Sequence, residues 1–563
     1  MNAQQRYEKW LHWAALQEEE RQSLLAIQED SLAITKAFGA TLTFGTAGLR
    51  GIMGMGTNRM NRFTVAWATA GIAEWLLETG KAGSTIVISS DSRLNHRLFT
   101  ETTALVLHQF GFKVLFWQIP APTPVLSWSV RHFDAAAGIM ITASHNPRNY
   151  NGYKAYDANG CQLLSPDANC VTAHADAYFN GKSLEITGDF ESLVEKGDIV
   201  LLEDALDIYL DTVYETLTPF VEKNHTPLRI GFTPLHGVGG APVKKVLERA
   251  GFEVIPVASQ FEPDGNFPTI ETPNPELPVA FDALYQLADK TPCDLLLATD
   301  PDGDRIGIAV PTATGYQLLN GNQIGSLLID FISQHRPVQA GDTIITTTVT
   351  SAFGKEVARY WGYELIETFT GFKYIGNCIN DICATNGKTF VFGYEESHGY
   401  LFGTHARDKD AIVTSLLVAF MAQHAKAQGH LLSDVLTALY DKVGAYTDRL
   451  VNLTFDPVPG QEPISDQIMA KLRQHPPTSL ADVPITKIVD YLQGIGTLPK
   501  ENVLQYVLNN GSVVSFRPSG TEPKMKCYIN ARHQTLSASQ ALAERLEQWF
   551  HRFVAQLKEE ASL

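Results

Sequence analysis

Three aspartates alternate along one short segment and give the strongest chemical signal in the sequence. Asp300, Asp302 and Asp304 stand in TDPDGDR, directly after the apolar run DLLLA. Carboxylates crowded in this way repel one another, and a divalent cation that prefers oxygen ligands, such as Mg²⁺, relieves that repulsion. An EF-hand does not fit, because Arg305 falls at its sixth position and Pro311 at its twelfth.

A single serine ends a second apolar run. In IMITASHNPRNYNGYK, residues 139–154, Ser144 is followed by His145 and a polar stretch that ends at Lys154. No G-x-S-x-G surrounds Ser144, so an α/β-hydrolase elbow does not fit. His145 is adjacent in sequence, which predicts a poor geometry for activating Ser144 directly. Alone, the segment is also compatible with a turn or a helix cap. A nucleophilic hydroxyl and a magnesium site at equivalent strand ends together indicate phosphoryl transfer.

The segment SFRPSGTEPK has the composition of a phosphate-binding loop. Arg517 offers a planar fork, Ser519 and Thr521 offer hydroxyl groups, and Gly520 allows backbone amides to approach an anion. An ordinary turn with a surface arginine is the alternative for this segment taken alone.

The segment GYEESHGY carries acceptors that suit the vicinal hydroxyls of a sugar. Glu395, Glu396 and Ser397 lie between glycines after an apolar run. Lys373 in TGFK and Arg407 in RDKDA are near in sequence and add positive charge. Each of these segments is also compatible with a salt-bridged surface.

A weak internal repeat predicts the elements that position these loops. Each copy has a β-branched-rich run, a helical pattern that ends in Gly plus an aromatic residue, a second apolar run, and a third apolar run that ends in a polar loop. In the first copy the three apolar runs are 84–93, 109–117 and 138–147. In the second copy they are 228–237, 248–257 and 293–305, and in the third copy they are 342–351, 359–368 and 391–400. Alternating strands and helices predict α/β domains, in which ligands bind where strands end.

The remaining part of the chain has a different pattern. From about residue 445 it reads as a smaller α+β unit that ends in a long amphipathic helix at about 538–560. The predicted fold is therefore three similar α/β domains with mixed sheets plus a C-terminal α+β domain. The predicted ranges are 1–204 with the serine loop, 205–320 with the acidic loop, 321–444 with the GYEES loop and 445–563 with the phosphate-binding loop.

Composition limits the classes of function. The 563 residues carry a net charge of −17, which argues against nucleic acid or an anionic membrane as partner but not against a small anionic substrate. The six cysteines form no CxxC pair, which favours reduced thiols and a cytoplasmic location over zinc or disulfides. Residues 1–27 read as one amphipathic charged helix rather than a signal peptide, and no apolar run is long enough to span a membrane.

Seven segments in order resemble the α-D-phosphohexomutase superfamily, which includes phosphoglucomutases and phosphomannomutases. They are FGTAGLRG at 44–51, TASHNP with Lys154, DPDGDR, TGFK, GYEES, RDKD and FRPSGTEP. The resemblance covers nearly the whole chain, and it implies four domains around a deep central cleft with a mobile fourth domain.

The resemblance also implies roles for individual residues. Ser144 is similar to the family's phosphoserine and, with Asp300, Asp302 and Asp304, to its magnesium ligands. The resemblance implies catalytic roles for Lys154, as general base, and for Arg50, His145 and Arg305. It implies that the sugar is bound by Thr370, Gly371, Lys373, Glu395 and Ser397. It implies that phosphate is bound by Arg407, Lys409, Arg517, Ser519, Gly520 and Thr521. A base role favours a lysine whose pKa is lowered by neighbouring cations.

The implied reaction is the interconversion of glucose 1-phosphate and glucose 6-phosphate, with Mg²⁺ and with glucose 1,6-bisphosphate as activator; mannose phosphates are further candidate substrates. The phosphoryl group passes from Ser144 to a sugar monophosphate, and the resulting bisphosphate turns and returns its other phosphate. A sugar phosphate is the expected partner, with monomer and dimer both left open.

Four alternatives follow from the same residues. TGFK and GYEES are similar to a long-chain branch that includes phosphopentomutases, so a pentose 1-phosphate substrate stays open. Synthesis of glucose 1,6-bisphosphate is a related activity in that branch. A catalytically silent sugar-phosphate sensor conflicts with the presence of Ser144, the aspartates and Arg517. An aspartyl-nucleophile phosphatase of the haloacid dehalogenase class leaves Ser144 and the fourth domain without a role.

Two histidines have no assigned role. In some relatives a histidine stands two places after the serine that binds the sugar, whereas here His398 follows Ser397 directly. His405 is the other candidate for a proton relay, and a structural role is open for both.

Overall fold

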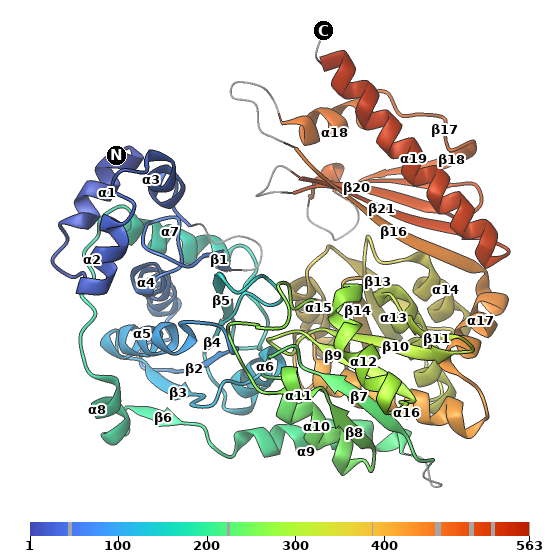
Figure 1. Ribbon diagram of the computed structural model, residues 1–563, viewed down its shortest axis with the longest axis horizontal. Coiled ribbons are helices and arrows are strands. Elements are labelled where there is room, and N and C mark those ends of the chain that lie inside the picture. The colour runs from blue at the N-terminus through green and yellow to red at the C-terminus, as the bar shows by residue number, and fades with distance from the viewer. Residues whose placement is uncertain are drawn as a thin grey trace. The chain divides into compact units, whose positions relative to one another are not determined.

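The chain forms two compact units in the computed structural model (Figure 1). The structure describes residues 1–42, 48–221, 226–385, 387–455, 463–494, 500–519 and 524–561. Unit 1 comprises Met1–Leu319, Gly371–Asn386 and Ser397–Ala427; unit 2 comprises Asn320–Thr370, Gly387–Glu396 and Gln428–Leu563. Among the described helices, none is both long and apolar enough to cross a membrane.

The first sheet of unit 1 has the strand order β1-β5-β4-β2-β3-β6. The strands are β1 (Leu49–Ile52), β2 (Thr85–Ser90), β3 (Lys113–Phe116), β4 (Ala137–Ile141), β5 (Tyr150–Tyr156) and β6 (Ile199–Leu201). The helices of this region are α4 (Arg62–Glu78), α5 (His96–Gln109), α6 (Thr123–His132), α7 (Asp167–Phe179) and α8 (Phe190–Glu195). The pairs β2–β3 and β2–β4 are parallel and β4–β5 is antiparallel, so the sheet is mixed.

The second sheet of unit 1 has the order β11-β10-β9-β7-β8. The strands are β7 (Arg229–Thr233), β8 (Glu253–Pro256), β9 (Leu295–Thr299), β10 (Ile306–Thr312) and β11 (Gly315–Leu318). The helices nearby in sequence are α9 (Ala205–Leu217), α10 (Gly240–Arg249), α11 (Ala258–Phe261) and α12 (Asp282–Lys290). Unit 1 also holds α15 (Phe372–Ala384), β15 (Gly399–Phe402) and α16 (Ala411–Ala427), and most residues of α16 are buried.

Unit 2 begins with a third α/β region. Its strands run in the order β13-β12-β14, with β12 (Asp342–Thr347) parallel to both neighbours. The other elements are β13 (Glu364–Thr368), β14 (Thr389–Glu395), α13 (Gly321–His335), α14 (Ala352–Trp361) and α17 (Leu432–Val443). In all three α/β regions the first strand of the repeat lies between the second and the third and is parallel to both, which confirms the predicted repeat.

The glycines of the repeat end helices as predicted. Gly111 and Gly251 directly follow the C-caps of α5 and α10, and Gly362 is itself the C-cap of α14; their φ angles are 86°, 86° and 89°. This left-handed conformation costs little for glycine, so it closes each helix and turns the chain into the next strand.

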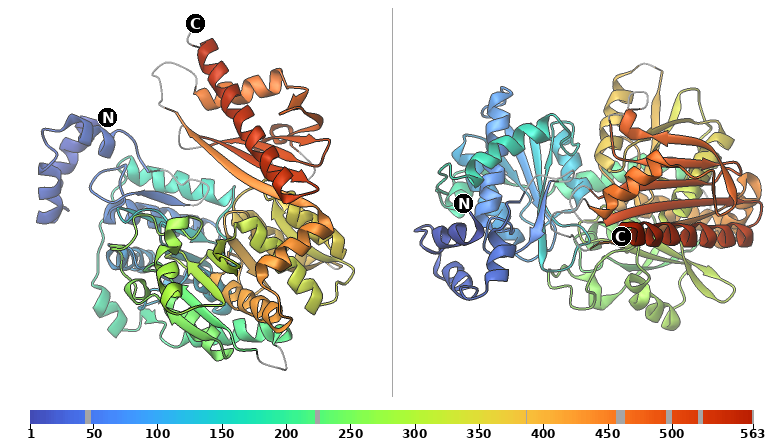
Figure 2. Two further views of the ribbon diagram at one scale, coloured as in Figure 1. Left: turned by 45° about the vertical axis from the view of Figure 1, so that its right-hand side comes forward. Right: turned by 90° about the horizontal axis from the view of Figure 1, so that it is seen from above.

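The C-terminal part of unit 2 is an antiparallel sheet in the order β16-β21-β20-β19-β18-β17. Its elements are β16 (Ala445–Thr454), β17 (Ser479–Leu480), β18 (Val483–Asp490), β19 (Leu504–Leu508), β20 (Val513–Pro518), β21 (Lys524–His533), α18 (Ile464–Gln474) and α19 (Leu536–Ala561). The long helix α19 lies along one face of this sheet (Figure 2), where its apolar side chains enter the sheet's core. The predicted fold class is confirmed: three α/β regions with mixed sheets and a C-terminal α+β region. The predicted domain boundaries stay predictions.

The N-terminal segment differs from the single helix expected. It forms α1 (Ala3–Leu11), α2 (Glu18–Leu25) and α3 (Ser31–Phe38). The chain leaves helical geometry after α1 because Trp13 stacks on Trp67, and Gln17 and Glu20 form a capping box that starts α2. Tertiary packing therefore interrupts a locally helical sequence.

Candidate active site

Ser144 lies at the end of β4 with an unusual backbone conformation. Its φ is +51°, in the left-handed region that L-residues other than Asn and Asp seldom adopt. The Ser144 amide donates to Thr142 Oγ1 at 2.8 Å, and the Ser144 side chain is buried. From this position Ser144 Oγ donates to Asp300 Oδ2 at 2.8 Å. The strand-end loops of the first two repeat copies thus meet within unit 1.

His145 is closer to the serine hydroxyl than its sequence position indicated. His145 Nδ1 lies 3.2 Å from Ser144 Oγ, so the expectation of a poor geometry is wrong. The reason is the left-handed turn at Ser144, which brings adjacent side chains to the same side. Burial, together with the positive charges of Arg305 and Arg50, lowers the pKa of His145 well below its ordinary value. A neutral imidazole therefore faces the hydroxyl.

The acidic loop closes on its own first carboxylate. Asp300 Oδ1 accepts from the backbone amides of Asp304 at 3.1 Å and Arg305 at 2.9 Å. The carboxylates of Asp300, Asp302 and Asp304 are buried, with one oxygen of each within 4.8 Å of the others. Within the described part of the chain, Asp302 Oδ1 and Asp304 Oδ1 have no hydrogen-bond partner. Buried carboxylates that converge in this way and keep oxygens without hydrogen bonds fit a divalent cation with oxygen ligands.

Two carboxylates of the acidic loop, Asp300 and Asp302, have pKa values shifted in opposite directions. Burial and the charges of Asp302 and Asp304 raise the pKa of Asp300 well above its ordinary value. Burial acts in the same direction on Asp302, but the ammonium groups of Lys154 and Lys409 and a hydrogen bond with Asp300 together outweigh it, so the pKa of Asp302 is lowered. Opposite shifts in adjacent carboxylates are typical of functional sites.

Two buried lysines neutralise the acidic loop. Lys154 Nζ donates to Asp302 Oδ2 at 2.8 Å and lies 3.4 Å from Asp304 Oδ2. Lys409 Nζ lies 3.1 Å from Asp304 Oδ2 and 3.0 Å from Asp408 Oδ1. Burial lowers the pKa of Lys154, but Asp302 and Asp304 outweigh it, so the pKa is raised. The expected lowering is wrong for this state, because the nearest groups are carboxylates rather than the cations that the sequence argument assumed.

Arg93 is a site residue that the sequence reasoning missed. Its fully buried guanidinium donates to the backbone carbonyls of Ser144, Asn146, Pro147 and Tyr150. Arg93 Nε lies 3.2 Å from Asp91 Oδ2, and Asp91 accepts from Thr142 Oγ1 at 2.6 Å. The available signal was the polar SDSR at the end of the first apolar run, which lies at the same sheet edge as the serine loop.

Further contacts hold the arginines and the acidic loop. Arg305 Nη1 donates to Glu276 Oε1 at 2.5 Å, and Arg50 Nη1 donates to Asn146 Oδ1 at 2.8 Å. Asp302 Oδ2 accepts from Thr123 Oγ1 at 2.9 Å. Glu276 and Thr123 were not predicted, because each is remote in sequence from the motif it supports.

The other predicted residues of unit 1 lie on the segments that return to it. Gly371 precedes α15 with φ of 119°, Lys373 is buried in its first turn, and Ser397 is half-buried before β15. Arg407 Nε donates to Asn380 Oδ1 at 2.6 Å, and Arg407 Nη1 donates to the carbonyls of Thr404 and Ala406. Several donors of Arg407 are thus used inside the unit.

The predicted residues of unit 2 belong to two different regions. Thr370 follows β13, and Glu395 is buried at the end of β14. Arg517 lies on β20, where Arg517 Nε donates to Glu501 Oε1 at 3.2 Å, and the Ser519 amide donates to the carbonyl of Lys524. Gly520 and Thr521 lie outside the described residues.

The two unassigned histidines are buried in unit 1. His398 Nδ1 lies 3.2 Å from the carbonyl oxygen of Ile306, and the backbone φ of His398 is +62°. His405 Nε2 lies 2.7 Å from Asp410 Oδ2, which also accepts from Tyr209 Oη at 2.6 Å. Both contacts suit structural histidines, and a relay role for either stays a prediction.

The fold and the converging serine, carboxylates and lysines define a phosphosugar mutase, an isomerase that moves a phosphoryl group within a sugar. Three family models describe phosphoglucomutase/phosphomannomutase α/β/α domains I, II and III, and they match residues 41–181, 207–315 and 320–443. The chain belongs to the phosphoglucomutase/phosphomannomutase family.

Individual relatives agree with this assignment. A phosphoglucomutase of Staphylococcus epidermidis is 35% identical over 513 residues, which cover 88% of this chain and 91% of that protein. A phosphoglucomutase of Staphylococcus aureus is 34% identical over 519 residues, with 90% and 92% covered. Among solved structures, the pp63/parafusin phosphoglucomutase of Paramecium has a TM-score of 0.71 at 18% identity, covering 92% of this chain and 96% of that one. A phosphoglucomutase/phosphomannomutase family protein of Burkholderia thailandensis has a TM-score of 0.68 at 18% identity, covering 92% and 97%.

Proposed function

We propose that the protein interconverts glucose 1-phosphate and glucose 6-phosphate through a phosphoserine at Ser144. The relatives at 34–35% identity are phosphoglucomutases, which supports glucose phosphates as substrates. The observation that carries the proposal is the 2.8 Å contact of Ser144 Oγ with Asp300, because it joins a buried hydroxyl to a buried carboxylate cluster.

The proposed reaction has two phosphoryl transfers. Phosphorylated Ser144 gives its phosphoryl group to the free hydroxyl of a bound sugar monophosphate, and the hydroxyl proton leaves to a base. The sugar bisphosphate turns end for end, and its other phosphate returns to Ser144. We assign Lys154 as the base. This requires that its side chain lose a proton to solvent, leave Asp302 for the sugar hydroxyl, and accept the hydroxyl proton as a neutral amine.

The proposed cofactors are Mg²⁺ and, as activator, glucose 1,6-bisphosphate. Asp300, Asp302 and Asp304, with the phosphate of Ser144, would hold the cation. When bound, Mg²⁺ neutralises charge on the transferring phosphoryl group. Glucose 1,6-bisphosphate supplies the phosphoryl group that primes Ser144.

The remaining predicted residues are proposed to bind substrate. Thr370, Gly371, Lys373, Glu395 and Ser397 would contact sugar hydroxyls, and Arg407, Lys409, Arg517 and Ser519, with Gly520 and Thr521, would contact phosphate. For the cellular location we propose the cytoplasm, an inference that depends on composition and cysteine spacing alone.

A one-pot competition tests the substrate. The enzyme receives equal glucose 1-phosphate and ribose 1-phosphate with Mg²⁺ and a trace of glucose 1,6-bisphosphate, and phosphorus NMR follows both products. Faster formation of glucose 6-phosphate supports the proposal, and mannose 1-phosphate is the next comparison. Faster formation of ribose 5-phosphate contradicts it and indicates a phosphopentomutase with the same chemical groups.

A further inference from the structure

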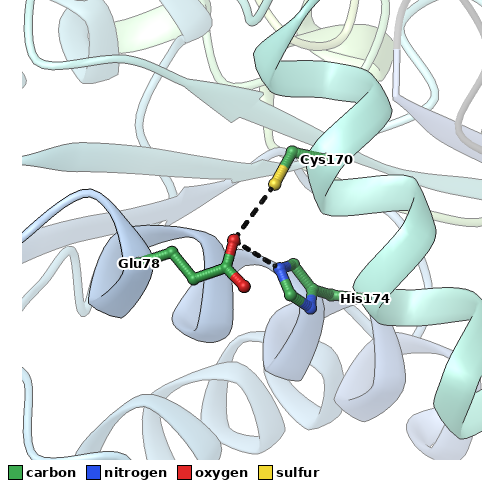
Figure 3. A group of neighbouring side chains, drawn as sticks. All are labelled: Glu78, Cys170 and His174. Atoms are coloured by element: carbon green, nitrogen blue, oxygen red, sulfur yellow. Dashed lines mark hydrogen bonds and ion pairs between the residues drawn. The ribbon is translucent and has the colours of Figure 1, made fainter.

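Two helices of unit 1 face each other with matched pairs of metal-ligating side chains. Glu74 and Glu78 are four residues apart on α4, and Cys170 and His174 are four residues apart on α7. Residues with this spacing lie on the same face of a helix. Figure 3 shows Cys170 and His174 directed from α7 toward the carboxylate of Glu78.

The donor atoms of this cluster converge. Glu78 Oε2 lies 3.0 Å from His174 Nε2 and 3.5 Å from Cys170 Sγ. One ligand atom from each of the three residues lies within 4.8 Å of the others. Thiolate, imidazole and carboxylate form a donor set suited to zinc, whereas magnesium prefers oxygen ligands only.

The second ring nitrogen of His174 contacts another carboxylate, that of Glu74. His174 Nδ1 lies 3.0 Å from Glu74 Oε2, and Glu74 in turn accepts from Lys182 and Tyr178. A histidine that ligates a metal commonly donates its other ring N–H to a carboxylate, which fixes the tautomer and the ring orientation. Glu74 therefore directs Nε2 of His174 toward Glu78 and Cys170.

The scaffold beneath the cluster is closely packed. Gly71 on α4 contacts α7 so closely that an added Cβ would lie 2.7 Å from the carbonyl oxygen of Val171 and 2.9 Å from Ala175. Since backbone meets backbone there, the two helices cannot slide past each other without a clash. Glu74 and Glu78 follow Gly71 within two turns, and Cys170 and His174 adjoin Val171 and Ala175, so the ligand pairs are held at a fixed separation, as a preorganised metal site requires.

We propose that Glu78, Cys170 and His174 bind one Zn²⁺ ion, with Glu74 as the positioning residue of His174. Glu78 is 59% exposed at its side chain, so water can complete a tetrahedral set of three protein ligands and one solvent ligand. Binding forms the Zn–S bond as the thiol of Cys170 releases its proton to solvent, and Nε2 of His174 contributes its lone pair. The ion links α4 to α7 and stabilises the first α/β region.

An ion-pair network without metal is the competing explanation. A protonated His174 between Glu74 and Glu78 would also join the helices, but such partly exposed pairs contribute little to stability. In that network Cys170 remains a thiol that donates a weak hydrogen bond to Glu78 Oε2, whereas in the zinc site it is a thiolate ligand. Cys170 therefore distinguishes the two explanations.

Cobalt substitution tests the site. The full-length protein, freed of metal with a chelator, is titrated with Co²⁺ and followed by absorption, because a cysteine thiolate ligand gives a charge-transfer band in the near ultraviolet. We expect the band to saturate at one Co²⁺ per chain and to disappear when Zn²⁺ is added. The band should be absent in Cys170→Ser. It should persist in Asp302→Asn, which separates this site from the acidic loop.

Matched variants sharpen the test. His174→Ala should lower Zn²⁺ affinity at least 100-fold, whereas His108→Ala, which alters another histidine–carboxylate pair in this region, should leave it unchanged. Glu74→Gln should retain the band and weaken Zn²⁺ binding by about 10- to 100-fold. A band of full intensity in Cys170→Ser, or Zn²⁺ affinity equal in wild type and His174→Ala, overturns the proposal.

Discussion

The serine loop and the acidic loop occupy equivalent strand ends of the repeat, yet different forces hold them. The acidic loop is closed by its own carboxylate, since Asp300 accepts from the amides of Asp304 and Arg305. The serine loop has its carbonyls held from outside by the buried guanidinium of Arg93, and Ser144 has a positive φ. Local hydrogen bonds explain the first loop, whereas the second depends on a residue 51 positions away in sequence.

This difference explains how one fold can present both the proposed nucleophile and the proposed cation site. Asp300 accepts hydrogen bonds from amides of its own loop, while Asp302 Oδ1 and Asp304 Oδ1 make none and remain available to a cation. A hydroxyl directed at that cluster needs a strained turn, and strain persists only where the surroundings fix it. Variants in each loop should therefore fail in different ways.

The largest effect is expected for Ser144→Ala. Loss of the nucleophile should lower kcat by about 10⁴-fold or more, with glucose 1-phosphate still bound. Steady-state kinetics and calorimetric binding measure the two quantities. Ser84→Ala, a half-exposed serine before β2, is the control and should keep wild-type kcat. Retained turnover in Ser144→Ala would remove the serine loop from the reaction.

Asp302→Asn should have the next largest effect. It removes a charge that Lys154 and Thr123 both contact, so Mg²⁺ affinity should fall and kcat should drop by about 10³-fold. A Mg²⁺ titration of initial rates measures this, with Asp289→Asn on the exposed face of α12 as control. If saturating Mg²⁺ restored wild-type kcat, Asp302 would act in metal binding alone.

Arg93→Met should combine a moderate loss of activity with a loss of stability. Without the guanidinium contacts to its carbonyl groups, the serine loop should no longer position Ser144 accurately, so kcat should fall by about 10²-fold. Asp91 left buried without its partner should reduce the free energy of unfolding by about 3 kcal/mol or more in a urea titration.

A double variant separates the two effects of Arg93. Asp91→Asn combined with Arg93→Met removes the unpaired charge, so stability should recover while kcat stays low. Recovery of both would show that Arg93 stabilises the fold without positioning Ser144.

Periodic and local features of the molecule were predictable, and remote contacts were not. The repeat predicted nine strands, three in each α/β region, and all nine are present. The glycines after α5 and α14 marked the ends of these helices. Arg93 was missed because its role depends on carbonyls that only the folded serine loop brings together. The raised pKa of Lys154 was missed because the charge of its neighbours cannot be read from its own motif.

The smallest effect is a pH dependence of stability at Asp91. Burial raises the pKa of Asp91 to about 6 although Arg93 acts against it. Because the folded state then binds the proton more tightly than the unfolded state, this group's contribution to stability falls as pH rises from about 4 to 6 and is constant above. The change is about 3 kcal/mol at most. Urea titrations at several pH values measure the slope, which Asp91→Asn should remove; an unchanged slope in that variant would assign it to another group.

The most direct test of the central claim locates the phosphoryl group. The enzyme is incubated with glucose 1,6-bisphosphate and Mg²⁺, digested, and its peptides are sequenced by mass spectrometry. We predict one phosphoryl group on Ser144 as an acid-stable ester. A phosphoryl group on Asp300 or Asp302, or on no residue, would contradict the phosphoserine mechanism.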